Sequence, residues 1–270
     1  MSKICTADEA MAGVHDGDMI AAHNWGLSGS PGYLFRALIE RGVRDLTLCI
    51  PNFFPLPEGF VGMGFTDPTI LLPQLKKVIS PFVGARGILS SVSDALFSTV
   101  AQEGRLEVET STHGVLIERL HAGAMGLGGV FSPVGVNTIV ADSKEKRTID
   151  GVEYVFEKSL CPDVGLIKAD KADKLGNLVY RGSARGANPI IAMASKYTIV
   201  EVFDVVDPGE LDPEIIVTPG IFVDCVVKIP DEDVYSSKRR PEIIQVLAGV
   251  GIGFAQSNQV ETATTEGGEQ

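Results

Sequence analysis

The sequence predicts an α/β fold, with one domain built on an open, mostly parallel sheet flanked by helices. Two stretches indicate this class. Residues 163–202 pass from an apolar run through a tight turn and a Gly/Asn/Pro loop to a small-residue helix and a second β-branched run. Residues 6–50 give a helix, a strand, a glycine loop, a helix and a strand in that order. This alternation is typical of α/β architecture, in which loops at strand ends carry the polar residues of a site.

The first fifty residues place a glycine loop at the end of a strand. Thr6 and Glu9 form a capping-box pattern, which predicts a helix from Thr6 to Val14. The short apolar run 19–22 predicts a buried strand, Pro31 suits the first turn of a helix, and 46–50 predicts the next strand. The helix after Pro31 has an apolar stripe of Tyr33, Leu34, Ala37 and Leu38. Loop 24–30 therefore lies at the carboxyl end of the first strand, where open α/β sheets bind ligands.

The middle of the chain is less regular. Residues 51–74 are rich in Pro, Gly and Phe, which predicts a long, apolar, irregular loop. Loops of this length are often functional, and a structural plug is the alternative. We further expect helices at 90–102 and 115–121, a strand at 105–110, and a β-hairpin at 144–156 that turns at Asp150-Gly151.

The last third divides into a folded part and an extension. Residues 163–202 predict strands at 164–169, 178–180 and 197–202, a turn at 174–177 and a helix at 189–195. After Pro230 come charged clusters, an apolar segment and a polar tail. We therefore expect a domain over 1–230 and a C-terminal extension over 231–270, the last part of which is disordered.

Composition excludes several classes of protein. The net charge of −12, from 23 Lys+Arg against 35 Asp+Glu, argues against nucleic-acid binding. The four cysteines are far apart, with no CxxC pair and no metal-ligand spacing, so we expect reduced, mostly buried thiols and no metal site. The start of the chain lacks an apolar signal region, and no apolar stretch suits a membrane helix. These features predict a soluble cytoplasmic protein without a membrane or nucleic-acid partner.

Three loops carry candidate chemistry. Glycines in 23–31 let backbone N–H groups approach an oxyanion or carboxylate, and the following helix N-terminus adds favourable potential. His113 lies between a predicted strand and a predicted helix. It is able to hydrogen-bond a substrate or titrate, or it simply caps the helix. Asn52 follows the second strand. The sequence contains no P-loop, no Gly-x-Ser-x-Gly elbow and no HExxH, and its glycine spacing fails the dinucleotide fingerprint.

The loops between the last strands suggest structural roles. Gly176 and Asn177 suit a tight turn, since Asn tolerates the left-handed region and Gly needs no side-chain room. Arg181 and Arg185 suit ion pairs with carboxylates at an interface.

A forty-residue stretch that contains LIKADKADKLGNLVYRGSARGANP resembles the α-subunit of family I CoA-transferases, the 3-oxoacid CoA-transferases. The resemblance continues through DGDMIAA, WGLSGSP, LIERLHAGAMGLGGVFSPVGVNT and GELDPEIIVTPGIFVD. It covers most of residues 1–230 and implies the same fold.

The resemblance also implies a mechanism and a partner. In this family a glutamate of the β-subunit, within Ser-Glu-Asn-Gly, attacks the acyl-CoA and becomes a glutamyl-CoA thioester that a second carboxylate resolves. Glu-Asn-Gly does not occur in this sequence. We therefore expect a chain without a catalytic nucleophile, which acts with a β-subunit in a heterodimer or α2β2 heterotetramer. Coenzyme A is then a substrate, alongside a carboxylic acid, and no cofactor is permanently bound.

The same comparison assigns the substrate-binding residues and shows departures from the family. His23, Asn24 and Trp25 stand where the family has Gly-Gly-Phe, whereas Gly29 and Pro31 match. His113 stands in place of a glutamine that lines the active site, Pro51 replaces the first of two asparagines, and Phe82-Val83-Gly84 replaces Tyr-Val-Gly. The implied substrate-binding residues are Trp25, Gly26, Gly29, Asn52, His113 and Gly114.

Two other functions stay open at this point. The altered loop residues are compatible with a subunit that hydrolyses or cleaves a CoA thioester, with His113 positioning water. A catalytically idle scaffold is the third possibility. The acyl group is undetermined, although the aromatic loops 25 and 53–65 favour acids larger than acetate.

Overall fold

The structure is a computed structural model that describes residues 2–24, 28–53, 68–81, 83, 104 and 106–231. The α-helices are α1 (Ala7–Met11), α2 (Gly32–Arg41), α5 (His113–Ala124) and α6 (Asn188–Ala194). Short 3-10 helices are η1 (Pro68–Gln74), η3 (Ile139–Ala141), η4 (Gly182–Arg185), η5 (Pro213–Ile215) and η6 (Gly220–Phe222). The strands are β1 (Met19–Ala22), β2 (Leu46–Cys49), β3 (Leu75–Ser80), β4 (Glu107–Thr110), β5 (Gly129–Ser132), β6 (Lys146–Ile149), β7 (Val152–Lys158), β8 (Val164–Asp173), β9 (Leu178–Val179), β10 (Tyr197–Val206) and β11 (Cys225–Lys228).

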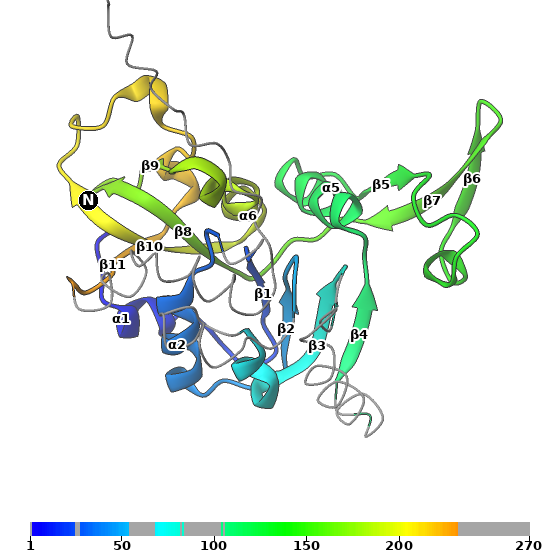
Figure 1. Cartoon of the computed structure of the whole chain (residues 1–270), viewed down its shortest axis with the longest axis horizontal. Helices are drawn as coiled ribbons and strands as arrows, with labels where there is room; N and C mark the ends of the chain where they lie inside the picture. Colours follow the sequence, from blue (N-terminus) through cyan, green and yellow to red (C-terminus); the bar gives the residue numbers. More distant parts are fainter. Residues whose placement is uncertain are drawn as a thin grey trace, which may run out of the picture.

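The main sheet confirms the predicted fold class. Its strands follow the order β11-β10-β8-β1-β2-β3-β4, and all these neighbours pair in parallel. The short β9 pairs antiparallel with β8. The strand order reverses at β1, because the chain first builds β2, β3 and β4 on one side and later places β8 on the other (Figure 1). Parallel pairing brings the carboxyl ends of these strands to one edge of the sheet.

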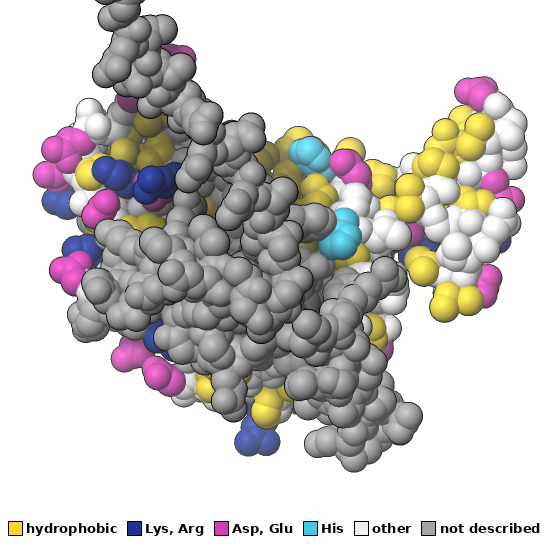
Figure 2. All heavy atoms as spheres, viewed as in Figure 1, with side chains coloured by type: hydrophobic (Ala, Val, Ile, Leu, Met, Phe, Trp, Pro, Cys, Tyr) yellow, Lys and Arg dark blue, Asp and Glu magenta, His cyan; other side chains and the backbone are white. Residues whose placement is uncertain are grey.

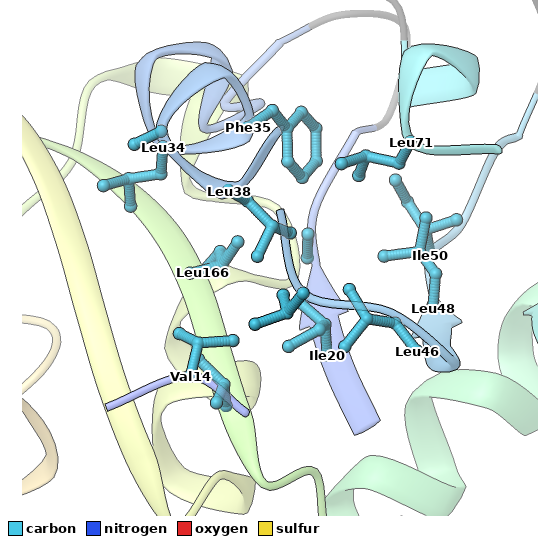
Figure 3. Close-up of a cluster of buried hydrophobic side chains, with 14 of the residues drawn as sticks. Val14, Ile20, Leu34, Phe35, Leu38, Leu46, Leu48, Ile50, Leu71 and Leu166 are labelled. Atoms are coloured by element: carbon cyan, nitrogen blue, oxygen red, sulfur yellow. The ribbon is translucent and has the colours of Figure 1, made fainter. Parts of the chain in front are cut away.

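Two apolar layers cover the two faces of this sheet. On one face, α1, α2 and η1 pack onto β1 and β2, and Figure 3 shows side chains of α2 meeting those of both strands. α2 contributes the buried Leu34, Phe35, Ala37 and Leu38. Three of these belong to the expected apolar stripe, whose fourth member, Tyr33, is partly buried, and Phe35 was not expected. On the other face, α5 and α6 pack against the strand side chains that point the opposite way, since successive residues of a strand face opposite sides of the sheet.

β1 is much shorter than its neighbour β8, and this difference positions the site. Ile20, Ala21 and Ala22 pair with Val164, Gly165 and Leu166, and there β1 ends. β8 continues beyond this point to Asp173, paired with β10 on its far side. Beyond Leu166, the Lys168 N–H of β8 donates to Asn188 Oδ1 at 3.2 Å, and Lys171 and Ala172 pair with β9.

A second sheet projects from the body beside α5 (Figure 1). It has three antiparallel strands in the order β5-β7-β6, and it confirms the predicted hairpin with Asp150 and Gly151 at positive φ of 51° and 80°. Glu157 is buried on one face and pairs with Lys144 at 2.7 Å. On the projecting part Ile139 is 89 % exposed, and Figure 2 shows hydrophobic side chains on its surface.

Several predicted boundaries need correction. The first helix has its Thr6–Glu9 capping box but ends at Met11, short of Val14. The last seven residues of the predicted loop 51–74 form η1, and β3 follows directly without having been predicted. α5 begins at His113, so His113 and Gly114 lie within the helix that was expected to start after them.

Other predictions lie outside the described residues. They are the helix at 90–102, the aromatic loop beyond Phe53, and nearly all of the extension 231–270. No described helix is long and apolar enough to cross a membrane.

Candidate functional site

The site lies at the carboxyl edge of the sheet, where the strand order reverses between β1 and β8. Open α/β sheets bind ligands in the crevice at such a point, because the loops from the two strands diverge there. The loop after β1 packs here against the segment formed by η4 and the start of α6. The predicted glycine loop is thus at the expected edge, and its neighbours are residues 183–188.

Gly29 is required by close packing. Its φ is +70°, and a Cβ at this position would lie 2.2 Å from the Ala184 carbonyl oxygen. The Gly29 carbonyl oxygen accepts a hydrogen bond from Asn188 Nδ2 at 3.1 Å. Ser28 and Ser183 hydroxyls meet nearby at 3.2 Å. The second half of the loop is therefore held against η4 and α6, which any larger residue at position 29 would prevent.

His23 fills space that another glycine leaves. Its Nδ1 accepts a hydrogen bond from the Ala187 backbone N–H at 3.3 Å, and a Cβ on Gly186 would lie 2.2 Å from its Nε2. Only 3 % of His23 is exposed, and this burial lowers its pKa to about 4. The imidazole is therefore neutral at physiological pH and packs the base of the loop.

Asn52 connects the loops that follow β1 and β2. Its Nδ2 donates to the Asn24 carbonyl oxygen at 3.0 Å. Asn24 itself is 1 % exposed, and its Oδ1 is buried without a hydrogen-bond partner in the described structure. The predicted residue Asn52 thus orients the backbone at the start of the β1 loop through its amide nitrogen.

The N-terminus of α2 faces a carboxylate of this chain itself. The sequence led us to expect that its positive potential favours a bound anion. In the structure the buried Glu201 carboxylate already accepts the Leu34 backbone N–H at 2.9 Å. Pro31, the residue that precedes the helix, makes no side-chain capping bond, so Glu201 from β10 supplies the acceptor. Part of the potential that the sequence assigned to a bound anion is therefore taken up by the Glu201 carboxylate, and anion binding by the loop itself stays a prediction.

The N-terminus of α5 has no comparable carboxylate in its own first turn. That turn contains no acidic residue, and Thr112 makes no side-chain capping bond. Gly114 is exposed, and a Cβ added there would meet nothing within 4 Å. Ser111 Oγ and Thr112 Oγ1 are buried and lack a hydrogen-bond partner among the residues described. His113, the first residue of α5, thus stands at a helix end that suits an anionic ligand.

Unsatisfied polar atoms concentrate at this edge. Buried polar groups in native proteins are nearly always hydrogen-bonded, so each exception calls for an explanation. Within the described ranges, several buried side-chain atoms that lack a hydrogen bond belong to residues that follow β1 or β4. They include His23 Nε2, Asn24 Oδ1, Ser30 Oγ, Ser111 Oγ and Thr112 Oγ1.

The predicted residues fall into two groups. Gly29 lies in the loop after β1, and Asn52 binds the Asn24 carbonyl oxygen of the same loop. His113 and Gly114 follow β4, which is separated from β1 by β2 and β3. At about 4.8 Å per strand the two groups are roughly 14 Å apart. Trp25 and Gly26 lie outside the described residues. A ligand that touches both groups has to extend across the ends of four strands.

Three residues with important contacts were not among the predicted site residues. Asn188 binds the glycine loop, and Glu201 and Lys168 form an ion pair at 2.9 Å behind it. The available signal was a charged residue within each of two otherwise apolar strands, LIKA and TIVEV. Charges in such runs are almost never fully buried unless they are paired.

The structural interpretations of the remaining loops agree with the contacts. Gly176 has a φ of +88°, and Asn177 donates hydrogen bonds to the Asp173 carboxylate in a tight turn. Arg181 and Arg185 are exposed and form no ion pair within the described part of the chain, so their role at an interface stays a prediction.

The cysteines are free thiols. Cys49 is buried and Cys161 is exposed. Cys5 and Cys225 are half-buried neighbours, and the hydrogen bond from Cys5 lowers the pKa of Cys225 to about 6. No group of three or more metal-ligating side chains occurs among the described residues.

The fold is an α/β architecture with a parallel main sheet, and the candidate site lies at the carboxyl edge of that sheet. Residues 4–229 match the family model described as coenzyme A transferase. The chain therefore belongs to the coenzyme A transferase family.

Curated relatives match over most of both chains. A probable succinyl-CoA:3-ketoacid coenzyme A transferase chain of Bacillus subtilis is 37% identical over 93% of this chain and 99% of the relative. A 3-oxoadipate CoA-transferase chain of Pseudomonas putida is 42% identical over 82% of this chain and 90% of the relative. The α-subunit of the acetate CoA-transferase of Escherichia coli is 37% identical over 84% and 96%. Each of these relatives is named as one subunit of its enzyme.

Solved structures share the fold at lower identity. Glutaconate coenzyme A-transferase from Acidaminococcus fermentans superimposes with a TM-score of 0.69 at 21% identity, over 92% of this chain and 88% of that one. The decarboxylase AibA/AibB gives a TM-score of 0.67 at 23% identity, over 93% of this chain and 95% of that one. At these identities the likeness establishes the architecture alone.

Proposed function

We propose that this chain is the α-subunit of a heteromeric CoA-transferase, which moves CoA from an acyl-CoA to a carboxylic acid. The observation that carries the proposal is the match to corresponding subunits of CoA-transferases over nearly the full length of both sequences. The partner β-subunit supplies the glutamate that becomes the glutamyl-CoA thioester. Coenzyme A takes part as a substrate.

In this proposal the two groups of site residues bind different parts of the substrates. The N-terminus of α5, with His113 and the exposed Gly114, suits the carboxylate of the acid, because its backbone N–H groups and dipole favour an anion. The β1 loop, which carries Trp25, Gly26 and the closely packed Gly29, shapes the wall that faces the acyl group. Its backbone is oriented by the bond from Asn52. The catalytic glutamate approaches from the partner.

A hydrolase or lyase on the same fold is the alternative function. The decarboxylase with the same architecture is named for a different reaction. Its 23% identity to this chain supports no assignment of that reaction here. His23, one of the altered loop residues that motivated this alternative, is buried and neutral against Gly186 and has little access to substrate. The transferase is therefore the favoured function.

The first experiment is co-expression with the adjacent β-like reading frame and incubation of the purified complex with acyl-CoAs. We expect exchange that depends on a carboxylate acceptor, a CoA-sized mass adduct on the partner, and no activity from this chain alone. Acceptor-independent release of CoA without an adduct would support the hydrolase. Transfer by the rigorously purified single chain would contradict the proposed division of roles.

A variant at the α5 N-terminus tests the site. His113→Ala in the assembled complex should raise KM for the carboxylic acid, by about tenfold for the loss of one or two hydrogen bonds at an anion site. KM for the acyl-CoA should change less. His113→Gln introduces the glutamine that the family resemblance implies at this position and should recover most of the loss. Unchanged turnover in His113→Ala would instead favour the idle scaffold.

A further inference from the structure

A closed chain of contacts surrounds the turn from the glycine loop into α2. Asn188 Nδ2 donates to the Gly29 carbonyl oxygen at 3.1 Å, and Asn188 Oδ1 accepts the Lys168 backbone N–H at 3.2 Å. Lys168 Nζ lies 2.9 Å from Glu201 Oε1, and Glu201 Oε2 accepts the Leu34 N–H at 2.9 Å. The circuit thus leaves the backbone at Gly29 and returns to it at Leu34.

We propose that Glu201 is a positioning residue for transfer, which acts with Lys168 and Asn188 to fix the turn Gly29–Leu34. This inference rests on the proposed function, because the turn belongs to the proposed acyl-binding wall. None of the three side chains needs to touch the substrate. Each holds a neighbour, and the result is a fixed direction for the loop that precedes α2.

The burial of Glu201 indicates that it positions the backbone rather than adding to the stability of the fold. Its side chain is fully buried and that of Lys168 is 16 % exposed, so both charges are largely removed from water. Desolvation of a buried ion pair offsets most of its attraction, and apolar pairs of equal size are often as stabilising. An apolar pair, however, has no acceptor for the Leu34 N–H. The carboxylate provides that acceptor and also complements the positive end of the α2 dipole.

Neighbouring groups restrain each side chain of this circuit of contacts. Glu201 and Lys168 are direct neighbours in the register of β10 and β8, so their backbones are fixed by the sheet. The Lys168 ammonium also lies 4.7 Å from the centre of the Phe203 ring, which restrains its head group. Asn188 is fully buried and donates a second bond to the Ala184 carbonyl oxygen at 2.9 Å. Gly29 cannot shift without breaking one of these bonds.

Two double variants separate the positioning role from the buried charge. K168M/E201Q removes both charges but keeps an oxygen acceptor for the Leu34 N–H. K168M/E201L removes the charges and the acceptor together. Neither variant leaves an unpaired buried charge, so both should fold, which circular dichroism and the melting temperature of the complex will check.

In the assembled enzyme we expect K168M/E201Q to stay within about threefold of wild-type kcat, and K168M/E201L to lose about tenfold or more, since small misplacements of positioning groups cost this much. N188A should give a similar loss, and combining it with K168M/E201L should add little further loss, because both open the same circuit. Equal kcat for the two double variants, at temperatures below their melting points, would overturn the proposal.

A matched control is the Lys144–Glu157 ion pair beside the projecting sheet, in which the Glu157 side chain is 3 % exposed. K144M/E157Q should leave kcat within about twofold, because it lies outside the site. A loss there equal to that of K168M/E201L would contradict a specific role for Glu201.

A second readout does not need activity. Backbone amide exchange of a peptide covering residues 28–38 should accelerate in K168M/E201L and not in K168M/E201Q. If the wild-type complex transfers no CoA but this exchange difference appears, the proposed function fails and the circuit stands. If the complex is active and the exchange is identical in both variants, the circuit fails alone.

Discussion

His23 shows how burial turns a titratable residue into a packing group. A histidine at a ligand-binding edge is an obvious candidate for chemistry, yet this ring lies against Gly186 with its pKa lowered to about 4. A sequence reports that position 23 is a histidine at a strand end. It does not report that a glycine far along the chain leaves room for the ring, because that requires the contact between the β1 loop and α6.

The lowered pKa of His23 predicts a stability change with pH. The unfolded chain binds a proton on this residue near pH 6.5, and the folded chain does so only near pH 4. The contribution of His23 to the free energy of unfolding is therefore fully present above pH 6.5. It is lost as the pH falls from 6.5 to 4, by up to about 3 kcal/mol. Urea unfolding of the wild type and of His23→Gln across this range will measure it, and parallel pH curves for the two proteins would contradict the assignment.

Gly29 gives a prediction on packing. Gly29→Ala places a methyl group against the Ala184 carbonyl oxygen at a positive φ, so we expect a loss of about 2 kcal/mol or more in the free energy of unfolding. Gly128→Ala is the control, because an added Cβ there meets nothing within 4 Å and its φ is not positive. Similar melting temperatures for both variants would show that the loop adjusts freely.

The candidate site was predictable to the level of loops. Patterns around Gly29, Asn52 and His113 indicated the carboxyl ends of three strands, and the sheet order brings these ends to one edge. The partners of those residues were not predictable, since Asn188 and Glu201 contact the glycine loop and α2 from distant parts of the chain. Local spacing carries no information about such contacts.

At the scale of elements, local signals were reliable where the chain itself makes the interaction. The capping box of α1 and the Asp150-Gly151 turn each depend on residues close together in the chain, and both have the predicted form. β3 and the full length of β8 depend on pairing with distant strands, and they were missed or shortened. The parallel sheet sets these lengths, because β8 stays paired with β10 as far as Asp173 and β3 lies between β2 and β4.

The capping box of α1 yields an element-scale prediction. Thr6→Ala removes the acceptor for the Glu9 backbone N–H, which lies 3.2 Å from the Thr6 hydroxyl. We expect a loss of about 1 kcal/mol in stability, as for other N-caps. Because this hydrogen bond is exposed and joins no residue of the candidate site, kcat of the complex should not change. Chemical denaturation and kinetics on the same preparation will check both parts.

At the scale of the whole molecule, fold class and family followed from the sequence, because α/β alternation and the long resemblance both extend over the domain. The projecting sheet was predicted only as its hairpin. Its separation from the main sheet follows from tertiary structure, since β5 pairs with β7 and, among the described strands, with none of the larger sheet.

The proposed assembly with a β-subunit predicts that the chain is more stable in its complex. A partner that binds only the folded form stabilises it by mass action, so the melting temperature should rise with partner concentration above the dissociation constant. Differential scanning fluorimetry of the chain with increasing partner will measure the shift. An unrelated acidic protein at equal concentration serves as the control, and an equal shift with that protein would argue against specific assembly.

The early end of β1 has a consequence for engineering this protein toward new acids. Positions 23 and 24 begin the loop and already hold large side chains, whereas Gly29 and the backbone that follows it are held by α6 and β10. A library that varies 23, 24 and Gly186, which contacts His23, would reshape the base of the loop while the second half of the loop keeps its direction. Libraries that also vary Gly29 would place a side chain against the Ala184 carbonyl oxygen.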